Sequence, residues 1–207
     1  ASVGVPVPLS VVVDSVDEAI AAVTKVGGRS VMKAVIPGLL HKSEAGGVAL
    51  DINADTASET YKRLSQLGAD KSKSNKVLVE TFVPKGVEAL VGITSSSLGK
   101  VLTIGVGGVL TEVISDVAVR LLPVDSKIVN EMIDETRLAI LFSGVRGAAA
   151  SNRDAFVDTV LRITDAVIDW PSGCELDINP LTVLPEGAWV LDSAYSPPAI
   201  SSERSKH

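Results

Sequence analysis

The sequence is poor in the residues that mark several common protein classes. Aromatic residues make up 3% of its 207 residues, and Cys174 is its one cysteine. A single cysteine excludes an internal disulfide framework and is typical of a reducing cytosol, so we expect a cytoplasmic protein. No apolar run reaches the roughly 20 residues that span a bilayer, so no membrane partner is expected. The net charge of -6 disfavours nucleic acid as a partner, because basic patches supply most of that affinity.

Aliphatic residues are plentiful instead. Hydrophobic residues make up 46% of the chain, and with so few aromatics they predict a core of Val, Leu, Ile and Ala. Predicted strands come in adjacent pairs rather than in strict alternation with helices, which favours an α+β fold over a doubly wound sheet. A waist near residues 80–86 predicts two lobes with a cleft between them, 1–83 and 84–195, followed by a frayed tail, 196–207.

Hydrophobic periodicity and turn residues place the elements. Capping boxes at Ser15/Glu18 and Thr56/Glu59 predict two helices, which end near Gly27 and Gly68. An apolar face of Phe156, Val160, Ile163 and Val167 predicts a later helix. The predicted helices cover residues 15–23, 56–68, 127–141 and 152–169. The predicted strands cover residues 11–13, 30–35, 48–52, 76–83, 87–93, 101–105, 117–122, 174–184 and 188–192.

Histidine is also scarce. Of the two in the chain, His207 is the last residue, and His41 lies between Leu40 and a run of Lys42, Ser43 and Glu44 that closes on Gly46-Gly47. This composition predicts a mobile, phosphate-facing loop, because imidazole is a good nucleophile near neutral pH.

Lys33 interrupts an apolar strand. A lysine inside such a run loses free energy on burial unless its ammonium finds a partner, and a nucleotide phosphate would be one. The alternative is a lysine on an edge strand that faces water.

The segment from Glu175 to Pro180 carries alternating polar residues. A strand period of two places Glu175, Asp177 and Asn179 on one face. If the hairpin loop is the four residues Leu184 to Gly187, Asn179 lies directly across from Asp192, and any even loop length keeps the two on the same face. Their oxygens suit Mg²⁺, which takes one or two protein ligands plus waters and phosphate oxygens. The alternative is a solvated polar face of an edge hairpin.

Two glutamates flank Pro84-Lys85-Gly86. The backbone at Glu80 ends an apolar strand and would meet a purine edge, and Glu88 would accept from ribose hydroxyls. Each is open to the alternative of an ordinary surface glutamate. Gly107-Gly108 lacks the pattern of a phosphate-binding loop and predicts a tight turn.

Several of these segments resemble one family in order along nearly the whole chain. They are Lys33-Ala34-Val35, Leu39 to Val48 around His41, Val79-Glu80, Gly86-Val87-Glu88, Val91-Gly92, Gly105 to Gly108 with Glu112-Val113 and Asp116 to Arg120, and Leu176 to Leu181 with Leu191-Asp192. They are similar to the nucleotide-binding part of ADP-forming acyl-CoA synthetases (acetate–CoA ligases). The β subunit of succinyl-CoA synthetase is a more distant relative. The resemblance implies an ATP-grasp fold, in which two α+β lobes hold ATP.

The resemblance also implies a reaction: acyl-CoA, ADP and phosphate are interconverted with a carboxylic acid, CoA and ATP. It implies that His41 becomes a phosphohistidine and that Asp177 or Glu175 orients it. Asn179 and Asp192 would hold Mg²⁺. The implied nucleotide contacts are Lys33, Lys42, Gly46, Gly47, Glu80, Thr81, Val83 and Glu88. A CoA-binding α subunit or domain is the implied partner.

Other functions remain compatible with the residues. One is an ATP-grasp carboxylate ligase without a phosphohistidine. Another is a non-catalytic nucleotide-sensing module of an acyltransferase. A protein with no nucleotide site would show no stabilisation by Mg-ATP.

Overall fold

The computed structural model describes residues 4–37, 45–72, 74–108, 116–145 and 147–198. The chain divides into two compact units at Val83 and Pro84. Residues 8–83 form the N-terminal unit, and residues 84–198 together with 4–7 form the C-terminal unit. Each unit has its own hydrophobic core.

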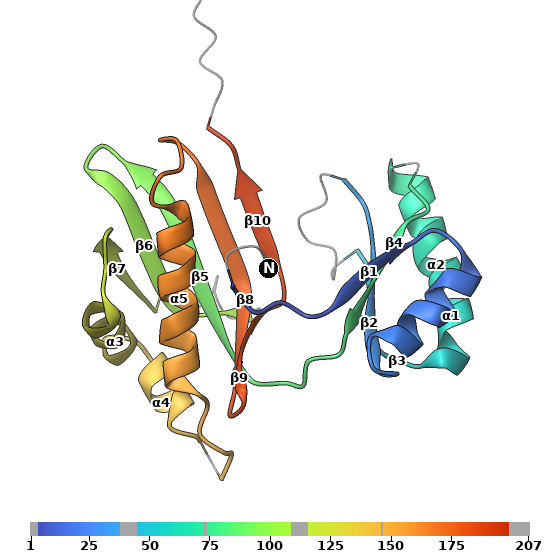
Figure 1. Cartoon of the computed structure of the whole chain (residues 1–207), viewed down its shortest axis with the longest axis horizontal. Coiled ribbons are helices and arrows are strands. Elements are labelled where there is room, and N and C mark those ends of the chain that lie inside the picture. The colour runs from blue at the N-terminus through green and yellow to red at the C-terminus, as the bar shows by residue number, and fades with distance from the viewer. Residues whose placement is uncertain (1–3, 38–44, 73, 109–115, 146, 199–207) are drawn as a thin grey trace, which may run out of the picture. The chain divides into compact units, whose positions relative to one another are not determined.

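The N-terminal unit is a four-stranded antiparallel sheet with two helices on one face (Figure 1). Its strands follow the order β1-β4-β2-β3, so β2 lies inside the sheet. Their bounds are β1 Ser10–Val13, β2 Ser30–Ala34, β3 Val48–Ile52 and β4 Val77–Thr81. Helices α1 (Val16–Lys25) and α2 (Ala54–Ser72) pack onto buried residues such as Met32 and Val79.

The ends of these helices test the capping predictions. Ser15 caps α1 as predicted, and its hydroxyl accepts from the Glu18 N–H. The predicted cap of α2 is wrong, because Asn53 takes that place and its side chain accepts from the N–H groups of Asp55 and Thr56. The predicted end at Gly68 is also wrong. A Cβ at Gly68 would lie 2.4 Å from the Ser74 carbonyl oxygen. Glycine is therefore needed inside the helix because the backbone that follows α2 packs closely against this position.

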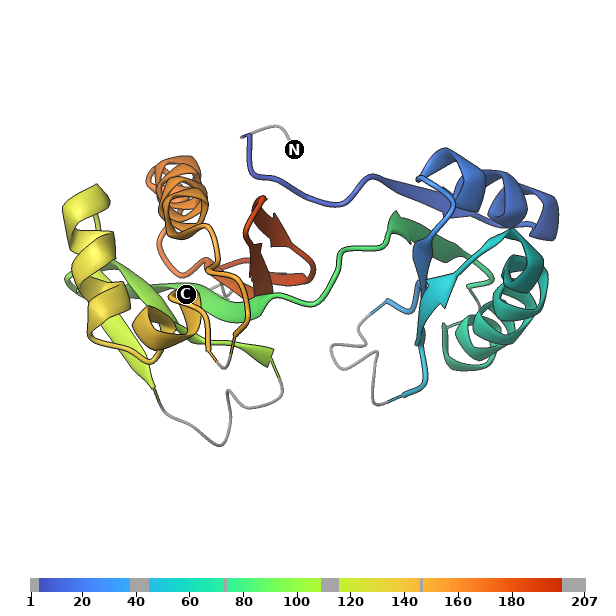
Figure 2. The same cartoon turned by 90° about the horizontal axis from the view of Figure 1, so that it is seen from below.

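The C-terminal unit is a six-stranded antiparallel sheet of order β10-β8-β5-β6-β7, in which β9 also pairs with β8. The strands are β5 Val87–Ser96, β6 Gly99–Val106, β7 Val117–Leu121, β8 Glu175–Leu184, β9 Gly187–Val190 and β10 Ser193–Ser196. The helices are α3 Ser126–Asp134, α4 Leu138–Phe142 and α5 Arg153–Val167, all on one face of this sheet (Figure 2).

The single helix predicted over residues 127–141 is two helices. The Asp116 carboxylate, from just before β7, accepts the Arg137 N–H at 2.7 Å. The Thr136 hydroxyl accepts the Leu138 N–H at 3.3 Å. Side chains thus take the N–H groups that would otherwise continue the first helix, and a second helix begins.

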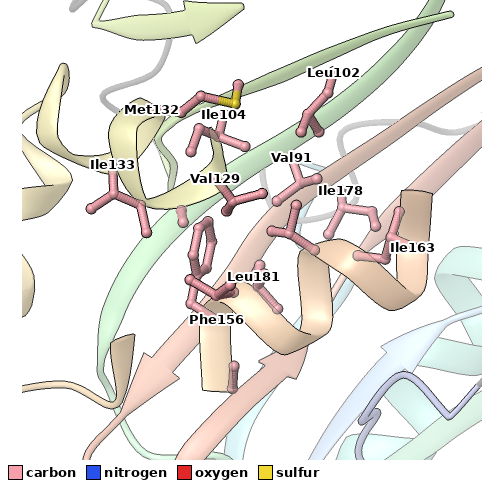
Figure 3. Close-up of a cluster of buried hydrophobic side chains, with 14 of the residues drawn as sticks. Val91, Leu102, Ile104, Val129, Met132, Ile133, Phe156, Ile163, Ile178 and Leu181 are labelled. Carbon is pink, nitrogen blue, oxygen red and sulfur yellow. The ribbon is translucent and has the colours of Figure 1, made fainter. Parts of the chain in front are cut away.

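The core of the C-terminal unit lies between its sheet and its helices. The four residues of the predicted α5 face are all buried, which confirms that periodicity. Figure 3 shows Phe156 and Ile163 on α5 beside Leu181 and Ile178 of β8. Burying an aliphatic or phenyl side chain of this size stabilises the fold by about 1.5–3 kcal/mol. This packing fixes the helix-facing side of β8 at Ile178, and the neighbouring Asp177 is exposed on the other side.

Among the helices of the described ranges, none combines the length and the apolar character that crossing a membrane requires.

Candidate functional site

The long strand β8 pairs with two short strands in one continuous register. Leu181 pairs with Val190 of β9, and Ile178 pairs with Ser193 of β10. Between these pairs the same register continues. Asn179 lies opposite Asp192, and the Asn179 N–H donates to the Asp192 carbonyl at 3.3 Å. The predicted cross-strand position of Asn179 and Asp192 is therefore confirmed by the register, although the turn has only the two residues Pro185 and Glu186.

Asp177 adds a second carboxylate to this place. Partial burial, and then the negative charge of Asp192, raise the pKa of the Asp177 carboxyl above its ordinary value. The Ser193 N–H donates to Asp192 Oδ1 at 3.0 Å and holds that carboxylate in place. Two carboxylates and one carboxamide oxygen are hard donors, so this set fits Mg²⁺. Within the described ranges, no group of three His, Cys, Asp or Glu side chains forms a metal site by itself.

Glu175 is the most distant of the predicted group on β8. It opens the strand, exposed to solvent and paired with Ser196. Asn179 lies four positions further along the strand, which is about 13 Å away. Of the two predicted carboxylates, Asp177 is therefore the one next to Asn179 and Asp192.

A glycine turn that sequence reasoning treated as a simple turn contacts Asn179 directly. The Gly108 N–H donates to Asn179 Oδ1 at 2.8 Å, and the Gly107 N–H donates to the Glu88 carbonyl at 2.9 Å. Glu88 itself lies against Gly108, since a Cβ there would meet Glu88 Oε2. The turn thus joins two predicted site residues from different strands. The glycine pair was the sequence signal for this turn, and it does not indicate which residues the turn contacts.

In the N-terminal unit, Lys33 and Glu80 form an ion pair. Lys33 Nζ lies 2.6 Å from Glu80 Oε2, and the side chains are 20% and 13% exposed. Because β2 is flanked by β4 and β3, the alternative of a lysine on an edge strand is wrong. The structure therefore brings together two residues that were predicted separately as nucleotide contacts.

The residues at the end of β4 differ in whether their peptide groups are already hydrogen-bonded within the unit. The Thr81 N–H donates to the Leu9 carbonyl, and the Thr81 hydroxyl donates to the Val26 carbonyl at 3.0 Å. The Phe82 N–H donates to the Arg29 carbonyl. Within the described part of the chain, Val83 makes no backbone hydrogen bond. Of the two predicted contacts, Val83 therefore has peptide groups available to a ligand, while Thr81 is tied into its own unit.

The predicted histidine loop is described only at its C-terminal end. The Gly46 carbonyl accepts from Arg63 Nη1 at 2.9 Å, and the Gly47 carbonyl accepts from the Ala34 N–H at 2.8 Å. Gly46 has a φ of +72°, which glycine adopts readily. The glycine pair is thus attached to α2 and to the end of β2. His41 and Lys42 lie outside the described residues.

Comparison with known proteins gives a consistent result. The family model of the ATP-grasp domain matches residues 1–195. The β subunit of acetate–CoA ligase [ADP-forming] I from Pyrococcus furiosus is 30% identical over 195 residues, which cover 92% of this chain and 84% of that subunit. Acetate–CoA ligase [ADP-forming] I from Archaeoglobus fulgidus is 33% identical over 182 residues, 86% of this chain and 27% of that protein.

Solved structures agree with this. A dinucleotide-forming acetyl-coenzyme A synthetase 1 from Ca. Korarchaeum cryptofilum matches with a TM-score of 0.79 and 27% identity, over 94% of this chain and 86% of that chain. That structure holds coenzyme A and Mg-AMPPCP, with its phosphohistidine segment pointing towards the nucleotide binding site. The expected distant relative is also found: the β subunit of an ADP-forming succinate–CoA ligase from Natronomonas pharaonis is 29% identical over 196 residues.

The chain therefore spans most of a separate β subunit but only about a quarter of the longer Archaeoglobus protein. With a family model that covers almost all of the described residues, it belongs to the ATP-grasp family, among the β-subunit-type domains of the ADP-forming acetate–CoA ligases.

Proposed function

We propose that this chain is the nucleotide-binding, phosphoryl-transferring part of an ADP-forming acyl-CoA synthetase. The complete reaction converts acyl-CoA, ADP and phosphate to a carboxylic acid, CoA and ATP. The observation that carries the proposal is the placement of Asn179 opposite Asp192 with Asp177 beside them, a donor set suited to a Mg²⁺–nucleotide complex. Membership of the acetate–CoA ligase branch of the ATP-grasp family supports the same function.

Asn179 and Asp192 are the proposed Mg²⁺ ligands. Bound there, Mg²⁺ would offset negative charge on the phosphate oxygens during transfer. Lys33 is the proposed cation for nucleotide phosphate oxygens. Its pairing with Glu80 holds the ammonium in place at low exposure, where a positive charge acts more strongly on a phosphate than it does in bulk water.

The base and the ribose would be held by other residues. The peptide groups of Val83 are the proposed contact for a purine edge, because Thr81 and Phe82 already use their N–H groups within the sheet. The exposed carboxylate of Glu88 is the proposed acceptor for ribose hydroxyls.

His41 is the proposed phosphoryl carrier. A ring nitrogen of His41 attacks the phosphorus of a phosphohistidine on the α part, so one P–N bond breaks and another forms. An oxygen of the ADP β-phosphate then takes the phosphoryl group, which yields ATP and returns a neutral imidazole. Lys42 would neutralise the carried phosphate, and Gly46-Gly47 would act as the hinge. Asp177, or Glu175, would accept from the other ring nitrogen and orient the ring.

The proposed partner is a CoA-binding α subunit or domain. The β subunit from Pyrococcus furiosus and the longer Archaeoglobus protein, of which this chain matches 27%, both favour a further part that carries the acyl and CoA chemistry. The acyl group would be selected by that part.

Transfer of label from ATP tests the proposal. The protein is incubated with γ-labelled ATP and Mg²⁺, and we expect an acid-labile, base-stable phosphoprotein that is lost in His41→Ala. The matched control is His207→Ala, the other histidine of the chain, which keeps the label. If the wild type stays unlabelled even with an α partner, the relay is excluded. If it binds Mg-ATP and never transfers phosphate, the chain is a nucleotide-sensing module instead.

A further inference from the structure

We propose that the turn Gly107-Gly108 is a positioning element for Asn179, and that it sets the orientation of the Asn179 carboxamide toward a divalent cation. This inference rests on the proposed function, since it takes Asn179 to be a Mg²⁺ ligand. It adds a residue to the site that acts through another residue and does not itself touch the metal.

The hydrogen bond defines the orientation of the amide. Asn179 Oδ1 accepts the Gly108 N–H at 2.8 Å. An amide oxygen carries two lone pairs, so it can accept this N–H and still coordinate a cation, whereas the amide nitrogen only donates. A carboxamide turned by 180° would place its NH₂ group against the cation. The Gly108 N–H selects the rotamer that presents oxygen.

The turn is also held by strand β5, which lies between β6 and β8. The Gly107 N–H donates to the Glu88 carbonyl at 2.9 Å, and a Cβ on Gly107 would lie 2.5 Å from the backbone carbon of Ala89. Contacts this short leave room only for glycine. The donor that faces Asn179 is therefore located by the sheet, independently of Asn179.

Gly108 also links the turn to Glu88, the predicted ribose contact. Its φ is +73°, and a Cβ there would lie 1.9 Å from Glu88 Oε2. Glu88 Oε2 ends a flexible, exposed side chain, so a methyl group at this position displaces that carboxylate, while the positive φ strains the turn itself. Because the turn carries the N–H that holds Asn179, we expect strain at Gly108 to reach the metal ligand.

Strain at the site can be compared with similar strain elsewhere, at a second glycine of the same unit. Gly147 has a φ of +85°, close to that of Gly108, and no described residue lies within 4 Å of a Cβ built there. Alanine at Gly147 adds the backbone strain alone. Alanine at Gly108 adds the same strain together with the contact to Glu88.

The test measures Mn²⁺ binding to the ADP complex of the full chain by electron paramagnetic resonance, with thermal unfolding of the metal-free protein as a second readout. We expect Gly108→Ala to weaken Mn²⁺ binding about 10- to 100-fold, the range for residues that orient metal ligands. Gly147→Ala lowers the melting temperature by a similar amount and leaves Mn²⁺ affinity at the wild-type value.

A double-mutant cycle tests whether the effect passes through Asn179. In the Asn179→Ala background, Gly108→Ala should weaken Mn²⁺ binding no further. Equal effects of Gly108→Ala in both backgrounds, or wild-type affinity in Gly108→Ala, would overturn the inference while the proposed function stands. If Asn179→Ala itself binds Mn²⁺ as the wild type does, the assignment of the metal ligand fails, and this inference fails with it.

Discussion

Lys33 and Glu80 are charged residues on inner strands of the N-terminal sheet. With side chains only 20% and 13% exposed, each loses hydration that the other partly replaces through a contact of 2.6 Å. A largely buried pair of this kind adds little net stability compared with apolar residues, but removing one partner leaves an uncompensated charge. The pair is therefore better explained by a need for a positioned ammonium than by stability.

This argument predicts an asymmetric response to mutation. Lys33→Met should destabilise the N-terminal unit by about 1–3 kcal/mol, because Glu80 loses its charged hydrogen-bond partner. Lys33→Met/Glu80→Met should recover most of that loss. Urea unfolding monitored by circular dichroism measures both variants. A double variant less stable than the single one would contradict the argument.

Asp177 is the second residue whose environment opposes its charge. Its pKa is raised in the folded state by burial and by Asp192, so the folded state favours the protonated form. Above the folded pKa the ionised carboxylate destabilises the metal-free protein, and below the ordinary pKa of an aspartate this penalty disappears.

Asp177→Asn should therefore raise the melting temperature of the protein at pH 7–8 in EDTA. The gain should shrink as the pH falls through the raised pKa and vanish below about pH 4, near the ordinary aspartate value. Differential scanning fluorimetry across pH measures this. A gain that is independent of pH would mean that the asparagine acts through packing instead.

At the scale of elements, side chains decide where helices begin. Asn53 and Thr56 hydrogen-bond reciprocally at the start of α2, since Asn53 Oδ1 accepts from the Thr56 N–H and the Thr56 hydroxyl accepts from the Asn53 N–H. Glu59, which the sequence pattern assigns to a capping box, is exposed one turn later. The helix therefore begins at Ala54, before the predicted capping box of Thr56 and Glu59.

Helix capping gives a prediction with an internal control. Asn53→Ala should destabilise the N-terminal unit by about 1 kcal/mol, because two N–H groups of the first turn lose their acceptor. Glu59→Ala should change stability by less than about 0.5 kcal/mol, as expected for an exposed position. Equilibrium unfolding in urea compares the two variants. Equal losses would restore the original assignment of the capping box.

For the molecule as a whole, the described chain has two separate hydrophobic cores. Leu64 is fully buried in the N-terminal unit and Phe156 is fully buried in the C-terminal unit. Each core joins a sheet to its own helices. Large residues in either core should therefore stabilise mainly the unit to which they belong.

Hydrogen exchange can locate these effects. Leu64→Ala should cost about 2–5 kcal/mol and Phe156→Ala about 3–5 kcal/mol. In each variant, faster amide exchange should concentrate in the unit that carries the substitution, as measured by mass spectrometry. Acceleration distributed equally over both units would indicate that the two cores unfold together.

Local patterns in the sequence determined much of the architecture. The spacing of Phe156, Val160, Ile163 and Val167 predicted the buried face of α5, because side chains three and four apart share one side of a helix. The period of two along β8 and the nearby turn placed Asn179 across from Asp192, because a short hairpin leaves little choice of register. The motifs around His41 and Asn179 indicated the family.

Tertiary structure alone decided which distant residues meet. Lys33 faces Glu80 because β4 lies beside β2, and Gly108 reaches Asn179 across 71 residues because β5 lies between β6 and β8. The break between α3 and α4 depends on Asp116, which is 21 residues from Arg137. The physical reason is common to all three: periodicity reports which side of an element is buried, whereas strand order, set by packing of the whole unit, selects its neighbours.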